Sequence, residues 1–284
     1  MAEAVDRPLG PHLNVDATRT WVGTVSMVTY YIIHAACLLA LYTGVSALDV
    51  GLCLGTYYLR LLGITAGYHR YFAHKAYKTS RAFQFVLAFL GCSAIQKGPL
   101  WWAAAHRRHH RYSDQPGDVH SPREGFYWSH QGWIFDGRWD VTEIDRIRDF
   151  SQYPELVWLN HWHAVPPLLL TGICYAIGGF SGVVWGVAVS TTLLWHTTYT
   201  INSLAHRWGT RRYDTSDDSR NNWFLALLTL GEGWHNNHHR FMASARQGFF
   251  WWEIDVTYYL LRGLEQLGLV SDLREPPPEV LEGR

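Results

Sequence analysis

Residues 22–45 read V-G-T-V-S-M-V-T-Y-Y-I-I-H-A-A-C-L-L-A-L-Y-T-G-V, a stretch that contains no Lys, Arg, Asp or Glu. A helix needs about 20 apolar residues to cross the hydrocarbon core of a bilayer, so this stretch is long enough to span a membrane. Residues 50–68, interrupted by Arg60, and residues 157–179 and 182–205 form three further apolar runs. Four buried helices of a soluble bundle are the alternative, but soluble helices are usually shorter and carry a polar face. We therefore predict an all-α membrane protein with four transmembrane helices.

The positions of Lys and Arg predict how these helices are oriented. Every Lys and Arg apart from Arg60 lies before residue 22, within residues 69–156 or after residue 205, and such residues favour the cytoplasmic side of a membrane. We therefore expect an integral protein of the inner (cytoplasmic) membrane, with both termini in the cytoplasm. Arg60 lies near enough to the cytoplasmic end of its helix to snorkel or to line a polar cavity. The expected segments are a cytoplasmic leader (1–21), transmembrane hairpin 1 (22–68), a cytoplasmic or interfacial segment (69–156), transmembrane hairpin 2 (157–205), a cytoplasmic helical cap (206–273) and a flexible tail (274–284).

The composition argues against several classes of protein. The 24 Lys and Arg balance the 24 Asp and Glu, so no net charge attracts nucleic acid, and we expect no such partner. The four cysteines lie apart in apolar stretches without CxxC spacing, which argues against a zinc knuckle and a disulfide framework. Histidine, by contrast, is abundant, with 16 residues.

Many of these histidines lie in motifs. The sequence contains H-R-Y-F-A-H at residues 69–74, H-R-R-H-H at 106–110, N-S-L-A-H at 202–206 and H-N-N-H-H at 235–239. Residues i, i+3 and i+4 share one face of a helix, so each HxxHH motif directs three imidazoles the same way. One metal ion accepts at most about six ligands, so these imidazoles predict a two-metal active site on the cytoplasmic side. The predicted ligands are His69, His74, His106, His109, His110, His206, His235, His238 and His239.

The other histidines lack this spacing, and we expect them to be hydrogen-bonded or at the surface. Among them, His196 is expected to support the ligands, because it is nearest to a segment that bears one. A shared site also requires His74 and His106 on the same side of the membrane. This requirement excludes a single crossing by the apolar residues 82–100, where we expect an interfacial or re-entrant helix.

The type of ligand limits which metal and which reaction the site suits. Hydrolytic zinc sites often include a carboxylate ligand and a nearby general base, and no HExxH motif is present. A two-metal site of imidazoles with open positions suits iron and O2, although imidazole also binds copper, nickel and zinc. A site at the membrane would meet lipid-derived substrates, of which the acyl chain is the natural one.

A family resemblance supports this interpretation. The stretches G-I-T-A-G-Y-H-R-Y-F-A-H (63–74), H-R-R-H-H (106–110), N-S-L-A-H (202–206) and G-E-G-W-H-N-N-H-H (231–239) resemble the membrane fatty acyl desaturases, most closely the stearoyl-CoA desaturase-like Δ9 group and its bacterial members. Membrane hydroxylases, alkane oxygenases and ketolases share the histidine motifs, whereas the G-I-T-A-G-Y-H-R and N-S-x-A-H elements favour the desaturases. The resemblance implies that a di-iron centre uses O2 to insert a cis double bond into a saturated acyl chain, for unsaturated fatty acid biosynthesis.

The resemblance also implies roles for individual residues. The histidines of the motifs match the ligands of the two irons, and Asn202 matches an asparagine that holds a metal-bound water. The family lines a kinked acyl tunnel at positions that correspond here to Gln96, Trp102, Thr198 and Tyr199. Without the resemblance, Trp102 and Tyr199 would be interpreted as interfacial aromatic residues.

The sequence departs from the family pattern at one stretch that bears on the carrier of the acyl chain. Animal acyl-CoA members read W-A-R-D before the second histidine motif, and that Arg and Asp contact coenzyme A. Here the stretch is Trp102-Ala103-Ala104-Ala105. The predicted substrate is therefore an acyl-CoA held by other residues, or an acyl chain on a phospholipid or a carrier protein.

The electrons for the reaction are expected from a separate protein. The sequence contains no cytochrome b5 segment and no flavin or nucleotide fingerprint. We expect a donor of the ferredoxin, rubredoxin, cytochrome b5 or flavin reductase type.

Two alternatives to a desaturase stay open. A related di-iron hydroxylase or oxygenase would leave a hydroxyl or keto group on a lipid or hydrocarbon. A metal-storing or metal-transporting membrane protein would place its ligands near the midplane of the membrane, whereas the motifs here lie at or beyond the ends of the predicted helices.

Overall fold

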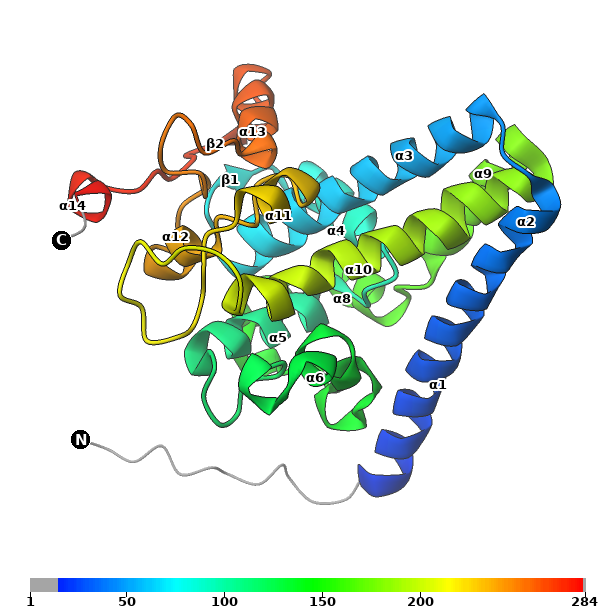
Figure 1. Ribbon diagram of the computed structural model, residues 1–284, viewed down its shortest axis with the longest axis horizontal. Coiled ribbons are helices and arrows are strands. Elements are labelled where there is room, and N and C mark those ends of the chain that lie inside the picture. Colours follow the sequence, from blue (N-terminus) through cyan, green and yellow to red (C-terminus); the bar gives the residue numbers. More distant parts are fainter. Residues whose placement is uncertain (1–14, 283–284) are drawn as a thin grey trace.

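The computed structural model describes residues 15–282, and these are mostly helical (Figure 1). Three apolar helices in this part of the chain are long enough to cross a membrane, Thr24–Thr43, Ala47–Ala73 and Val165–His206. Residues 1–14 of the predicted leader and residues 283–284 of the predicted tail lie outside the described residues.

The first two apolar helices are joined by a tight turn. Helix α1 (Val15–Ala36) continues through a 3₁₀ turn (Cys37–Leu39) into α2 (Ala40–Thr43), which ends at Gly44 with φ of 68°. Ser46 then caps α3 (Ala47–Leu62), because its side chain accepts from the backbone N–H of Asp49 while the Asp49 carboxylate accepts from that of Ser46. Helix α3 continues as a π-helix (Gly63–Ala73), so His69 lies within the second apolar helix rather than after it.

The third apolar helix reverses its direction. It consists of α9 (Val165–Val183), a π-helix (Val184–Val189), α10 (Ser190–Ser203) and a 3₁₀ turn (Leu204–His206). Its 42 residues would extend about 63 Å if straight, roughly twice the thickness of the hydrocarbon core. Gly179 instead adopts φ of 60° and ψ of −147° inside α9. A Cβ on Gly182 would lie only 2.4 Å from the carbonyl oxygen of Cys174, so the two arms pack with their backbones in close contact.

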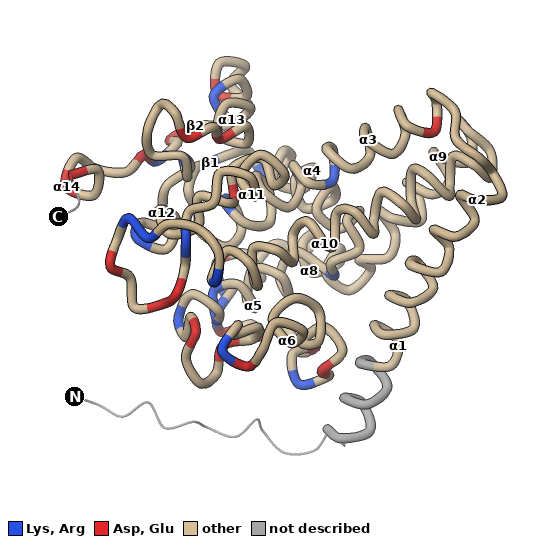
Figure 2. Tube along the Cα trace, in the orientation of Figure 1, with Lys and Arg blue, Asp and Glu red and all other residues tan. Residues whose placement is uncertain are grey.

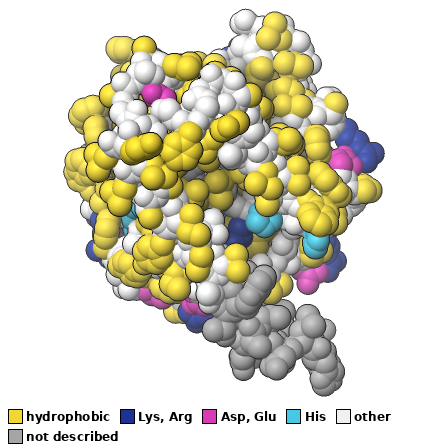
Figure 3. All heavy atoms as spheres, turned by 90° about the vertical axis from the view of Figure 1, so that its right-hand side faces the viewer, with side chains coloured by type: hydrophobic (Ala, Val, Ile, Leu, Met, Phe, Trp, Pro, Cys, Tyr) yellow, Lys and Arg dark blue, Asp and Glu magenta, His cyan; other side chains and the backbone are white. Residues whose placement is uncertain are grey.

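The two turns lie next to each other, at the upper right of Figure 1. The Ser181 hydroxyl joins them, because it donates to the Asp49 carboxylate at 2.7 Å. Figure 2 shows that the described charged residues gather around the other elements, whereas α1, α2, α9 and α10 are almost free of them. Figure 3, which faces the turns, shows apolar side chains over much of the surface. Leu41 and Leu168, for example, are 87% and 68% exposed, as expected for side chains that face lipid.

Arg60 lies inside this bundle. Its side chain is 0% exposed and donates to the hydroxyls of Ser190 and Thr191, both at 2.6 Å, and to the carbonyl of Thr56 at 3.1 Å. Arg60 therefore neither snorkels to the surface nor lines the cavity described below. It connects α3 to α10 through neutral oxygen atoms.

The charged part of the molecule is built from shorter elements. After the second apolar helix come α4 (Arg81–Cys92), α5 (Pro99–Tyr112), α6 (Phe126–His130), α7 (Arg148–Ser151) and α8 (Pro154–His161), with four 3₁₀ turns between α5 and α7 (Pro122–Glu124, Gly132–Phe135, Gly137–Trp139 and Ile144–Arg146). After the third come α11 (Trp223–Leu228), α12 (His235–Arg240), α13 (Val256–Gln266) and α14 (Pro278–Leu281). Strand β1 (Lys78–Thr79) pairs antiparallel with β2 (Val270–Ser271).

The segment 82–100 is not one helix. Helix α4 has 12 residues and is therefore about 18 Å long, too short to cross a bilayer. The chain then turns through Ile95 and Lys97, both with positive φ, and enters α5. Helix α4 packs tightly against the π-helix, where a Cβ on Gly63 would lie 2.6 Å from the backbone of Leu90.

The end of the chain is folded where a flexible tail was expected. Residues 274–282 include α14. Val280 of this helix is buried in a small apolar cluster with Tyr213 and Phe249, so these residues pack against the charged part of the molecule.

Candidate metal centre

Four separate elements bring the motif histidines together. The π-helix presents His69, and His74 follows directly after it. The second half of α5 presents His106, His109 and His110, and the 3₁₀ turn after α10 presents His206. Helix α12 presents the histidines of the H-N-N-H-H motif. The elements that carry the histidines are thus far apart in sequence and meet only in the folded chain.

The two asparagines of the H-N-N-H-H motif hold α12 in place. The Asn236 carbonyl accepts from the backbone N–H groups of Arg212 and Tyr213 at 2.8 and 2.7 Å. The Asn237 amide donates to Glu253 at 2.8 Å and to the backbone carbonyl of Gln247 at 2.9 Å. Both side chains are fully buried, so they fix the direction in which the neighbouring histidines point.

The histidines form two groups. In each group the ring nitrogens that could bind an ion lie within 4.8 Å of one another. The five-histidine cluster consists of His69, His74, His106, His110 and His238. The four-histidine cluster consists of His109, His206, His235 and His239. All nine histidines that the sequence predicts as ligands are therefore in one of two candidate metal sites.

The spacing of the ring nitrogens fits bound metal ions. An ion about 2.1 Å from two imidazole nitrogens at right angles holds those nitrogens about 3.0 Å apart. The Nε2 atom of His106 lies 3.0 Å from the Nε2 atoms of both His74 and His110. In the other cluster, the Nε2 atoms of His206 and His235 are also 3.0 Å apart, and the buried Nε2 of His239 has no hydrogen-bond partner among the described residues.

The protonation of five of the nine rings suits metal binding as well. Burial lowers the pKa of His106, His110, His235 and His238 well below the usual range of histidine. It also lowers the pKa of His239 to about 4, although Asp217 acts in the opposite direction. These rings are therefore neutral near pH 7, and neutral imidazole is the form that coordinates a metal.

Carboxylates contact the Nδ1 atom of several of these rings, the ring nitrogen that is not directed at the other histidines. The Nδ1 atoms of His109, His206 and His239 lie 2.9, 2.9 and 2.7 Å from Asp118, Asp114 and Asp217, and Nδ1 of His69 contacts Glu232. Burial raises the pKa of Asp118 and Asp217, but the facing histidines outweigh it and hold both pKa values below the usual range. Such contacts fix the ring so that Nε2 would face a bound metal.

The sequence did not reveal these carboxylates, because no fixed spacing relates them to the histidines. A second difference concerns His196, which was expected to support the ligands. It bonds instead to His34 and His130, each at 3.0 Å, outside both clusters. His120 was expected to be a hydrogen-bonded or surface residue. It is buried beside His109, with a ring-centroid distance of 4.3 Å.

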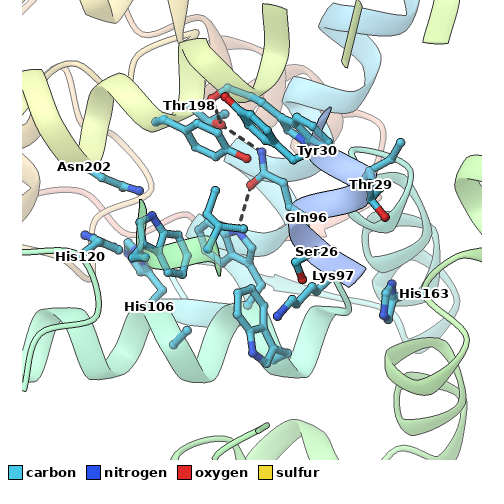
Figure 4. Close-up of a pocket in the computed structure, with 18 of the residues that line it drawn as sticks. Ser26, Thr29, Tyr30, Gln96, Lys97, His106, His120, His163, Thr198 and Asn202 are labelled. Atoms are coloured by element: carbon cyan, nitrogen blue, oxygen red, sulfur yellow. Dashed lines mark hydrogen bonds between the residues drawn. The ribbon is translucent and has the colours of Figure 1, made fainter. Parts of the chain in front are cut away.

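A cavity of about 250 Å³ lies beside the five-histidine cluster, of which His106 lines the wall. All five residues that the resemblance assigns to the tunnel or the metal-bound water line it, namely Gln96, Trp102, Thr198, Tyr199 and Asn202. Asn202, His106 and His120 lie toward one end, and His163 and Thr29 toward the other (Figure 4).

Hydrogen bonds connect three of these residues across the cavity. The Trp102 indole donates to the Gln96 carbonyl at 3.2 Å, and the Gln96 amide donates to the Thr198 hydroxyl at 3.0 Å (Figure 4). The wall contains α1, α5 and α10 residues but none from Ala47–Ala73.

Comparison with known proteins identifies the family. The family model for fatty acid desaturases matches residues 45–264. The chain belongs to the fatty acid desaturase family. Together with the three apolar helices, this membership makes the chain a membrane protein.

Individual desaturases from plants and a cyanobacterium are similar over most of the chain. An acyl-CoA C20 Delta5-desaturase of Anemone leveillei is 40% identical over 86% of this chain and 79% of its own length. Delta-9 acyl-lipid desaturase 2 of Arabidopsis thaliana is 40% identical over 87% of this chain and 81% of its own. The sn-2 palmitoyl-lipid 9-desaturase of Nostoc sp. (strain 36) is 37% identical over 77% and 78%.

Proposed function

We propose that this member of the desaturase family is an integral membrane di-iron fatty acyl desaturase, which inserts a cis double bond into a saturated acyl chain. The observation that carries the proposal is the position of the five-histidine cluster beside the cavity, since His106 belongs to this cluster and also lines the cavity wall. We further propose four membrane spans, because the third apolar helix folds back at Gly179, with the clusters and both termini on the cytoplasmic side.

The chemistry requires an oxidant that can remove hydrogen from an unactivated methylene group, and two irons with O2 would supply it. The two histidine clusters would hold the irons, and the four carboxylates that face Nδ1 of the rings would keep these rings oriented. Asn202 lies on the cavity wall near His106 and His120, where its side chain can hold a metal-bound water. The Trp102–Gln96–Thr198 hydrogen bonds fix the wall against which the acyl chain bends.

The substrate is proposed to be an acyl-CoA or acyl-lipid, with the double bond at the Δ9 position. Relatives with 37–40% identity include both an acyl-CoA and acyl-lipid desaturases, and two of them are named for position 9. Electrons are proposed to come from a separate donor protein of the ferredoxin, rubredoxin, cytochrome b5 or flavin reductase type.

Product analysis tests this function directly. The chain is expressed in a host that lacks the relevant unsaturated acids, and the lipids are analysed by mass spectrometry with double-bond location. A desaturase removes two hydrogens from the acyl chain, whereas a hydroxylase adds one oxygen. A product of the second kind, or no change relative to the His109→Ala variant, contradicts the proposal.

Replacing Trp102 by Ala is expected to lower turnover by up to about 100-fold, because a shift of about 1 Å in a bound substrate can have that effect. The substitution removes the donor to Gln96 and opens the wall, so products with the double bond at neighbouring carbons are also expected. Iron content should not change. The measurement is double-bond position and rate in purified protein.

The matched control is Trp251→Ala, because Trp251 is 82% exposed and does not line the cavity. If Trp102→Ala retains the normal rate and double-bond position, Trp102 is not part of the substrate wall.

A further inference from the structure

The two histidine clusters differ in the partners of the ring nitrogen Nδ1, which faces away from the other rings of the cluster in the carboxylate-bound histidines. In the four-histidine cluster, three of the four rings have Nδ1 against a carboxylate, at 2.7–2.9 Å. In the five-histidine cluster, His69 alone has such a partner in the part of the chain that the structure describes, and this partner is Glu232. Each cluster also has one ring whose Nδ1 is buried without a hydrogen-bond partner among the described residues, His238 in the five-histidine cluster and His235 in the four-histidine cluster.

The clusters also differ in local charge. Asp114, Asp118 and Asp217 are all at least 94% buried. Their hydrogen bonds come from histidine rings, backbone N–H groups and the Thr215 hydroxyl. Among the described residues, no Lys or Arg forms an ion pair with any of the three.

Glu232 behind the five-histidine cluster is different, because it pairs with a cation. The Arg70 guanidinium lies 2.8 Å from Glu232 and 2.9 Å from Asp255, and Arg70 is itself buried. Arg70 therefore offsets negative charge near the five-histidine cluster. The three aspartates behind the four-histidine cluster form no such ion pair among the described residues, although Arg123, which is half-exposed and pairs with Asp218, also lies near Asp114 and Asp217.

Both differences act on a bound cation in the same direction. A carboxylate that accepts from Nδ1–H makes the ring a more basic ligand, and removing such a partner typically lowers metal affinity 10- to 100-fold. Negative charge in a buried site attracts a metal cation more strongly than it would in water, and more so where no Lys or Arg pairs with it. The four-histidine cluster thus has fewer rings, but more of them have a carboxylate partner at Nδ1.

We propose that the two metal positions are unequal, and that the four-histidine cluster retains its ion longer than the five-histidine cluster does. This inference rests on the two-metal centre of the proposed function. It predicts an order of metal loss, and it assigns Asp114, Asp118 and Asp217 as positioning residues of the more tightly held ion.

The experiment follows iron release from the purified, iron-loaded full chain into an excess of a coloured iron chelator. The wild type should release its iron in two phases of equal amplitude, with rates at least about 10-fold apart. Asp217→Asn keeps the shape of the side chain and removes its charge. It should accelerate the slow phase by about 10- to 100-fold and leave the fast phase unchanged.

The matched control is Glu232→Gln, which makes the same chemical change behind the other cluster and should leave the slow phase unchanged. Asp118→Asn provides a second test of the four-histidine cluster in case Asp217→Asn does not fold, as judged by size-exclusion chromatography and circular dichroism. A single release phase in the wild type, or a slow phase that responds to Glu232→Gln and not to the aspartate variants, overturns the inference.

These outcomes separate this inference from the proposed function. A chain that binds two irons and forms double bonds but releases both irons at one rate contradicts only the inequality of the sites. A chain that binds no iron contradicts both.

Discussion

Replacing His109 by Ala is expected to lower product formation more than about 100-fold, because the loss of a metal ligand exceeds the 10- to 100-fold effect typical of its hydrogen-bonding partners. His109 is 1% exposed, and its Nδ1 lies 2.9 Å from Asp118. The variant therefore also leaves Asp118 buried without its histidine. The measurement is product formation together with bound iron, determined by elemental analysis.

The control for this variant is His161→Ala. His161 is exposed at the end of α8 and belongs to neither cluster, so its removal should leave turnover and iron content unchanged. His163 is less suitable, because it lines the cavity. If His109→Ala and His161→Ala behave alike in well-folded protein, the assignment of the ligands is wrong.

Removing the metal is expected to abolish product formation altogether. Protein with full activity should contain about two irons per chain, since the two clusters offer two separate sets of ligands. Adding Fe(II) to metal-free protein should restore turnover, whereas Zn(II) should fill the same sites without restoring it, because zinc has no redox chemistry.

This prediction is checked by elemental analysis and turnover measured on the same samples. Protein treated in the same way but without the chelator serves as the control. Full activity with a single metal per chain, or with zinc alone, contradicts the two-iron proposal.

The apolar helices were predictable from composition, with differences at their ends. Most of the run 22–45 and all of 50–68 lie in the first two apolar helices, Thr24–Thr43 and Ala47–Ala73, because a long run with almost no charge has few stable alternatives to a membrane helix. The second of these continues to Ala73 and so includes His69. Residues 82–100 were less predictable, since the break after Cys92 depends on Ile95 and Lys97 adopting positive φ, which neither residue type favours.

The candidate metal ligands were predictable as a set. The HxxHH spacing places histidines on one face of a helix whatever surrounds it. Which ring belongs to which cluster was not predictable, because His109 and His110 are neighbours in sequence and yet lie in different clusters. One residue along a helix rotates a side chain by about 100°, so only the positions of the other helices decide which site each ring reaches.

The sequence by itself determined the class of the protein and the identity of its nine histidine ligand candidates, since apolar length and i, i+3, i+4 spacing are local properties of a helix. Only the tertiary structure decided which carboxylates support those ligands. Asp114 and Asp118 follow α5, Asp217 precedes α11, and Glu232 precedes α12. Their role depends on where four separately positioned segments meet. An aspartate in a loop has no periodicity that marks it, and it becomes a histidine partner only when packing brings its oxygen within hydrogen-bond distance of Nδ1.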